Sequence, residues 1–148
     1  MIYLQELSFF KNFPAEIVQN LQKVAQIVTF KRGEVVIKQG GKNNALYFLL
    51  YGLLEVHVDG GLVAQLNTEG DLIGEMSLIS RQNSSATIKA ETKVELLKID
   101  GDALVKVASE GESGIESLYK IYSDILVQKL HLTNQRAKQF EKTAKELV

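Results

Sequence analysis

The length, composition and charge of the chain limit what it can be. It has 148 residues, 45% of them hydrophobic, which is enough for one compact core. The absence of cysteine excludes disulfides, thiolate catalysis and zinc–thiolate sites, and no window approaches the roughly 18 apolar residues of a membrane span. A net charge of −1 excludes a strong electrostatic footprint for nucleic acid or anionic lipid, so we expect a cytoplasmic protein without membrane contact.

In chain order, the first predicted element is a short helix from Pro14 to Leu21, because proline is favoured at the first helical position. Glycines then punctuate the chain between Phe30 and Glu75, and short runs of β-forming residues lie between them. Such spacing predicts about eight short strands and is typical of an all-β sandwich or roll. The predicted strands cover residues 26–30, 34–38, 46–50, 53–58, 62–66, 71–73, 86–90 and 94–99.

The run 53–58 shows the alternation of a half-buried strand. Leu54, Val56 and Val58 lie on one face, and Leu53, Glu55 and His57 lie on the other. The dipeptide Asp59-Gly60 follows directly and predicts a tight hairpin turn.

Helical patterns return in the last third of the chain. A short helix is expected over Ala103–Ala108, and the stretch 113–148 lacks proline and predicts one long helix. Its first half has a broad apolar face that should pack on the roll, and its second half narrows to a coiled-coil seam over 126–147. We expect a parallel homodimer through that seam; the alternative is an amphipathic helix folded back on its own roll. The seam consists of Leu126, Leu130, Thr133, Ala137, Phe140, Ala144 and Leu147.

The glycine pattern ends in the stretch 70–79, GDLIGEMSLI, followed by SSATI at 84–88. These stretches resemble the phosphate-binding cassette of cyclic-nucleotide-binding domains, and the stretches 30–40 and 46–56 match that family in order and spacing. The resemblance covers residues 7 to 135 approximately. It implies a mainly β fold with flanking helices: a jelly-roll-like double-stranded β-helix at 1–112, with an N-terminal helix, and a dimerisation and signalling helix at 113–148.

The resemblance also implies a ligand site. Backbone N–H groups at the start of a short helix over 74–78 would receive a cyclic phosphodiester, and Gly74 would let the backbone approach it. Glu75 would accept a hydrogen bond from the ribose 2′-hydroxyl; the alternative is a carboxylate that only stabilises the helix N-terminus. The expected ligand-binding residues are Ile73, Gly74, Glu75, Met76, Ser77, Ser84, Ser85, Ala86, Thr133 and Asn134.

One position departs from the family pattern. Nine residues after the cassette glutamate, where the family has a phosphate-binding arginine, this chain has Ser84. Loss of one member of a desolvated charge pair costs about 2–5 kcal/mol. Ser84 and Ser85 offer two neutral hydrogen bonds instead, which are weaker than a charge-assisted contact. Arg81 is an alternative source of charge, although its polar loop favours a solvated side chain.

A second resemblance concerns the long helix. Leu130–Asn134 is similar to the segment of the catabolite activator protein in which hydroxyl residues meet the adenine. Thr133 would then bond the purine amino group within one subunit, and Asn134 would approach from the partner. Alternatively, Thr133 only sets the register of the seam.

These observations leave two functional hypotheses. The first is a non-enzymatic sensor of cyclic AMP or another cyclic nucleotide, with no required cofactor, that signals through its last helix. The second is a degenerate roll that binds no cyclic nucleotide and serves as a dimeric protein-interaction module. The chain shows no catalytic motif and no clustered metal ligands, so we expect neither an enzyme nor a metal site. It ends without the helix-turn-helix that similar transcription factors carry, so no direct DNA binding is expected.

Overall fold

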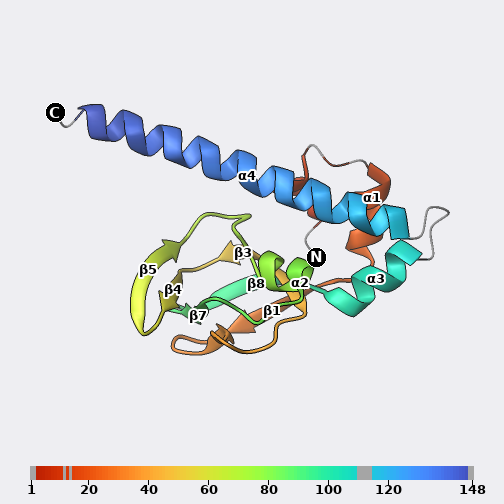
Figure 1. Ribbon diagram of the computed structural model, residues 1–148, viewed down its shortest axis with the longest axis horizontal. Helices are drawn as coiled ribbons and strands as arrows, with labels where there is room; N and C mark the ends of the chain where they lie inside the picture. The colour runs from red at the N-terminus through yellow and green to blue at the C-terminus, as the bar shows by residue number, and fades with distance from the viewer. Residues whose placement is uncertain (1–2, 12, 14, 110–114, 147–148) are drawn as a thin grey trace.

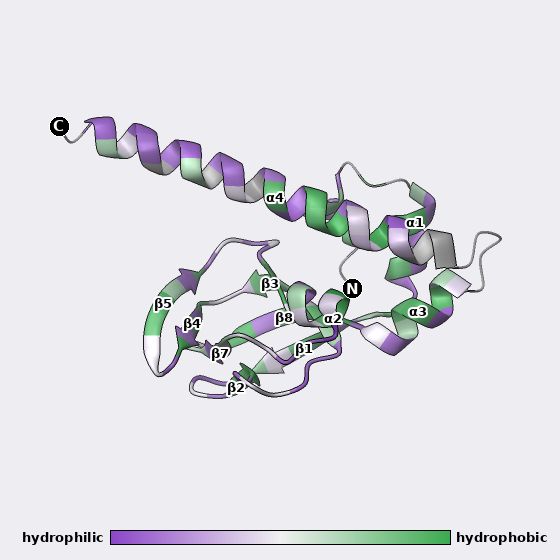
Figure 2. Cartoon of the chain, viewed as in Figure 1, coloured by the Kyte–Doolittle hydropathy of each residue, from purple (hydrophilic) through white to green (hydrophobic). Residues whose placement is uncertain are grey.

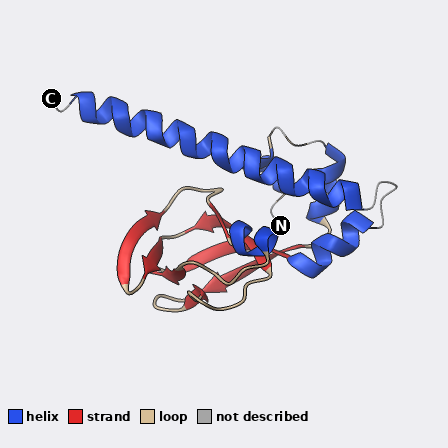
Figure 3. Ribbon diagram, viewed as in Figure 1, coloured by secondary structure: helices blue, strands red, loops and turns tan. Residues whose placement is uncertain are grey.

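A computed structural model describes residues 3–11, 13, 15–109 and 115–146, and it confirms the roll (Figure 1). Within the described residues, the strands form two antiparallel four-stranded sheets, in the orders β1-β8-β3-β6 and β2-β7-β4-β5 (Figure 3). Every predicted strand is present, with each bound within one residue of the prediction. The strands are β1 Ala25–Phe30, β2 Val35–Ile37, β3 Ala45–Tyr51, β4 Leu54–Val58, β5 Gly61–Leu66, β6 Leu72–Ile73, β7 Thr87–Ala90 and β8 Val94–Asp100.

The predicted hairpin joins β4 to β5. Asp59 and Gly60 both have left-handed backbones, with φ of 52° and 81°, as a two-residue type I′ turn requires. The alternation predicted for β4 is weaker than expected, because only Leu54 is buried and the other four residues are half-buried. Val56 lines a cavity, and His57 Nε2 lies 3.2 Å from Glu55 Oε1, so neither face is simply core or solvent.

Four α-helices are found in the described residues: α1 Ala15–Gln22, α2 Glu75–Ser80, α3 Gly101–Ser109 and α4 Ile115–Glu146. They confirm the predicted helices, although Pro14 and the proposed domain boundary at 112 lie outside the described residues. Two short 3₁₀ helices, Leu4–Glu6 and Ser8–Phe10, were not predicted. They bury Phe9 and Phe10, whose rings lie 5.0 and 4.9 Å from that of Phe48.

Helix α4 has two different halves. Its first half joins the helical part of the core, where Ile121 and Ile125 are 3% and 0% exposed, as predicted for a face that packs on the roll. Its second half extends past the roll and is more hydrophilic (Figure 2). The described seam residues there are exposed, with Leu130 at 61%. None of the described helices has the length and apolarity needed to cross a bilayer.

Candidate ligand-binding site

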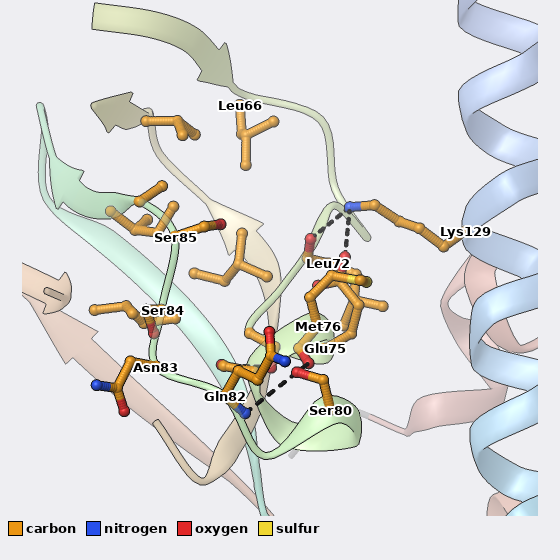
Figure 4. Close-up of a pocket in the computed structure, with 17 residues that line it drawn as sticks. Leu66, Leu72, Glu75, Met76, Ser80, Gln82, Asn83, Ser84, Ser85 and Lys129 are labelled. Atoms are coloured by element: carbon orange, nitrogen blue, oxygen red, sulfur yellow. Dashed lines mark hydrogen bonds and ion pairs between the residues drawn. The ribbon is translucent and has the colours of Figure 1, made fainter. Parts of the chain in front are cut away.

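A cavity of about 450 Å³ opens between α2, the segment that leads into β7, and α4 (Figure 4). Its floor is apolar and comes from both sheets, with Ile37 and Ile88 from one sheet and Ile73 from the other. Its rim is polar and is formed mainly by α2 and residues 82–85. Cavities of about 300–1,000 Å³ with an apolar lining and a few polar groups are typical small-molecule sites.

The protein's own packing requires glycine at position 74. Gly74 has a left-handed backbone with φ of 88°, and a Cβ there would lie 2.5 Å from the Ala45 carbonyl oxygen and 2.7 Å from Asn43 Nδ2. Asn43 Nδ2 donates to the Ala45 carbonyl at 2.9 Å and lies 3.0 Å from Ser77 Oγ. The side-chain amide of Asn43 therefore ties the start of α2 to β3 and fixes this wall of the cavity.

Glu75 lies in the cavity wall with its side chain only 12% exposed. Its carboxylate Oε1 lies 3.7 Å from Lys129 Nζ of α4, and the same ammonium donates a 2.7 Å hydrogen bond to the Leu72 carbonyl. Among the described residues that line the cavity, Glu75 and Lys129 are the two charged ones. The cavity thus contains one anion and one cation, and they are paired.

Ser84 lies opposite, in the segment that leads to β7. Its backbone is fixed, because its N–H donates to Gly41 at 2.9 Å and its carbonyl accepts from the Gly40 N–H at 2.8 Å. Its side chain is buried, and Ser84 Oγ has no hydrogen-bond partner within the described part of the chain. A buried hydroxyl without a partner costs about 1–3 kcal/mol, so a ligand that supplied a partner would recover this energy.

Comparison with known proteins identifies the family. Residues 27–110, more than half of the chain, match the family described as "Cyclic nucleotide-binding domain". The chain belongs to this family. It is 30% identical to a Pycsar effector protein of Rhodovulum over 111 residues, and this alignment covers 72% of this chain and 43% of the relative. It is 34% identical, over 82 residues, to the cAMP-dependent protein kinase regulatory subunit of Schizosaccharomyces pombe, covering 55% of this chain and 20% of the relative.

Solved structures agree on the fold. The C-linker and cyclic-nucleotide-binding region of zELK channels, crystallised in the presence of cAMP, matches with a TM-score of 0.67 and 28% identity over 88% of this chain and 63% of that chain. A cyclic nucleotide-binding domain of Methylobacillus flagellatus matches with a TM-score of 0.67 and 21% identity over 97% of this chain and 79% of that chain. The chain therefore has the β-roll of this family, and it spans less than half the length of the curated relatives named above.

The structure brings most of the predicted site residues of this cyclic nucleotide-binding domain to one place. The eight that line the cavity are Ile73, Gly74, Glu75, Met76, Ser77, Ser84, Ser85 and Ala86. Thr133 and Asn134 are exposed on α4 and do not line it, and Thr133 Oγ1 donates to the Lys129 carbonyl at 2.9 Å. Their proposed roles involve a second subunit and remain predictions.

Arg81 does not provide the missing charge in this cavity. It ends α2 with a left-handed φ of 61° and lines a separate cavity of about 410 Å³ beside Tyr122. Burial raises the pKa of Tyr122, and the neighbouring Arg81 charge partly offsets that rise. The two cavities share the wall formed by α2, and the guanidinium belongs to the second one.

Lys129 is the site residue that the sequence analysis missed. It lies beside the predicted coiled-coil seam and outside the expected ligand-binding residues, and it reaches the cavity. A signal was present in the spacing, because Ile121, Ile125 and Lys129 follow each other at intervals of four and lie on one face of a helix. The face that buries the two isoleucines in the core therefore presents Lys129 to the roll.

Proposed function

We propose that this domain is a non-enzymatic regulatory module that binds a cyclic nucleotide of the cyclic AMP type in the cavity beside α2. One observation supports this most directly: in a member of this family, the predicted cassette residues converge on a cavity of about 450 Å³ that contains an acidic side chain. Glu75 would accept the ribose hydroxyl, and the apolar floor would receive the base. No cofactor is needed for binding of this kind.

The phosphate would lie near residues 84 and 85. The orphaned hydroxyl of Ser84 offers a donor there, and Ser85 is an exposed second hydroxyl on the same rim. Two neutral donors bind an anion more weakly than a bidentate guanidinium does, so we expect weaker binding than an arginine at position 84 would give.

Signalling would pass through α4. This helix is anchored by Ile121 and Ile125 in the core, and four residues later it places Lys129 in the cavity wall. A ligand that contacts Glu75 changes the surroundings of the Lys129 ammonium and thereby the packing of α4 on the roll. The domain would act in the cytoplasm without contacting DNA itself.

The exposed half of α4 would form a parallel homodimer. Leu130 is 61% exposed and lies in the 126–147 seam, where a second copy would cover it. A Leu130→Glu substitution should then reduce the mass measured by light scattering to that of a monomer, because it places one charge from each chain in the apolar seam. Val127→Glu, at a residue that is 63% exposed but outside the seam, is the matched control and should leave the mass unchanged.

A second function is favoured by a different observation. Position 84 carries no charge, and Glu75 is already paired with Lys129 inside the chain. A roll whose two charged cavity residues pair with each other could serve as a protein-interaction module without ligand. Under this alternative, the fold and the seam are retained and the cavity stays empty.

Isothermal titration of the purified domain with cyclic AMP and cyclic GMP distinguishes the nucleotide sensor from the protein-interaction module. Micromolar binding by the unmodified chain supports the sensor. Absence of binding up to millimolar ligand, with binding restored in Ser84→Arg, supports the interaction module. Since the charge contact is worth about 2–5 kcal/mol, Ser84→Arg should tighten binding by about 30-fold or more. Thr29→Arg adds the same charge on β1, opposite Glu95 and outside the cavity wall, and should change nothing.

A further inference from the structure

Lys129 lies where the long helix α4 meets the β-roll. Two polar contacts of Lys129 connect α4 with the roll. Its ammonium spans from the helix to a carbonyl of β6 and a carboxylate of α2. The side chain is 33% exposed, so it is anchored but not sealed off from the cavity.

The donors of this ammonium are not all used. A lysine ammonium has three N–H donors and no acceptor. One bonds the Leu72 carbonyl at 2.7 Å and a second faces Glu75 Oε1 at 3.7 Å, which leaves a third for a ligand (Figure 4). Glu75 carries a second carboxylate oxygen, which is an acceptor that a ligand hydroxyl can use. The pair therefore offers a charged donor and a charged acceptor side by side.

A ligand that matches this pair carries a hydroxyl donor next to an anionic oxygen. A ribose with a free 2′-hydroxyl beside a 3′-linked phosphodiester has this arrangement on adjacent carbons. We propose that Lys129 is the phosphate-binding cation of this site: its ammonium contacts one phosphoryl oxygen from α4, the hydroxyls of Ser84 and Ser85 contact the phosphate from the other side of the cavity, and Glu75 accepts the neighbouring hydroxyl. This inference rests on the proposed function and identifies the residue that selects a charged ligand over a neutral one.

The location of this cation on α4 has a mechanical consequence. A phosphate held by the roll alone would not touch the helix, whereas a phosphate held by Lys129 connects the two directly. The energy of that contact is available only while α4 stays docked, so ligand binding favours the docked helix.

The test compares a charged probe with a neutral one. Wild type, Lys129→Met and Lys129→Arg are titrated calorimetrically with cyclic AMP and with adenosine, which keeps the 2′-hydroxyl and the base but lacks the phosphate. Lys138→Met, on the exposed part of α4, is the matched control for loss of one lysine. Lys129→Met should weaken binding of cyclic AMP by at least about tenfold and that of adenosine by less than about twofold, while Lys129→Arg retains most of the affinity for cyclic AMP.

Each other outcome overturns the inference. Equal weakening of both probes would mean that Lys129 only shapes the cavity. Unchanged or tighter binding of cyclic AMP by Lys129→Met would mean that the ammonium competes with the ligand for Glu75, and the proposed function would stand without it. If the wild type binds neither probe while Ser84→Arg binds cyclic AMP, both the sensor function of the unmodified chain and the role of Lys129 are refuted.

Discussion

Gly74→Ala is the substitution for which the structure predicts the largest effect at the site. Two costs add. A residue with a Cβ in the left-handed region costs about 1–2 kcal/mol. The new methyl group would also lie 2.5 Å from the Ala45 carbonyl oxygen and 2.7 Å from Asn43 Nδ2, and forced overpacking of this kind costs about 1–3 kcal/mol. We therefore expect Gly74→Ala to lower the free energy of unfolding by about 2–5 kcal/mol.

Gly33→Ala separates these two costs. Gly33 has nearly the same backbone, with φ of 87°, but a Cβ there meets nothing within 4 Å. It should show only the conformational cost of about 1–2 kcal/mol. Equilibrium urea unfolding with linear extrapolation measures both variants against the wild type. If Gly74→Ala is no less stable than Gly33→Ala, the close approach of Ala45 and Asn43 does not determine the residue at position 74, and our account of this wall is wrong.

Two further predictions concern α4 and β4. Ile125→Ala should lower the free energy of unfolding in urea by about 2–4 kcal/mol, because Ile125 is 0% exposed. Val127→Ala, at a residue that is 63% exposed, should change it by less than about 0.5 kcal/mol. Similar losses in the two variants would argue against the docking of α4. The hydrogen bond from His57 lowers the pKa of Glu55 in the folded protein. Its contribution to folding stability is therefore present above the ordinary carboxyl pKa, and it is lost as the pH falls through the lowered pKa of the folded protein. His57→Val removes the donor and should raise the Glu55 pKa in an NMR titration, and an unchanged pKa would contradict this cause.

The strands could be predicted because turn-forming residues at their ends are recognisable in the local sequence. The Asp59-Gly60 turn determines where β4 ends and β5 begins, and glycines with positive φ mark other turns in the same way. The two 3₁₀ helices could not be predicted, because segments of three residues have no periodicity to detect. Their position depends on Phe9 and Phe10 packing against Phe48, which is a contact between distant parts of the chain.

The candidate site shows the same difference between residues that are close in sequence and contacts between distant parts of the chain. Cassette residues that are close in sequence, such as Glu75 and Ser84, could be assigned together because one segment carries them. The spacing places Lys129 on the buried face of α4, but its partners could not be assigned, since its contact with Leu72 joins residues 57 positions apart and depends on how α4 docks. Arg81 shows the converse: it is close to the cassette in sequence, yet the left-handed turn that ends α2 puts it at the second cavity.

The proposed role of Lys129 also fixes how the two ends of α4 must influence each other. Its contact with the ligand requires the helix to be docked, so ligand affinity and helix docking are coupled by one free energy. Coupling of this kind is reciprocal: a ligand that stabilises docking by a given factor is itself bound less tightly, by that same factor, when a partner pulls the helix away. Ile121 and Ile125 hold the first half of α4 in the core, and Lys129 follows them directly. A partner that binds the exposed second half therefore acts on the helix next to the site. An interaction at the seam and a ligand in the cavity would therefore compete or cooperate through the same lysine, and loss of Lys129 should uncouple them.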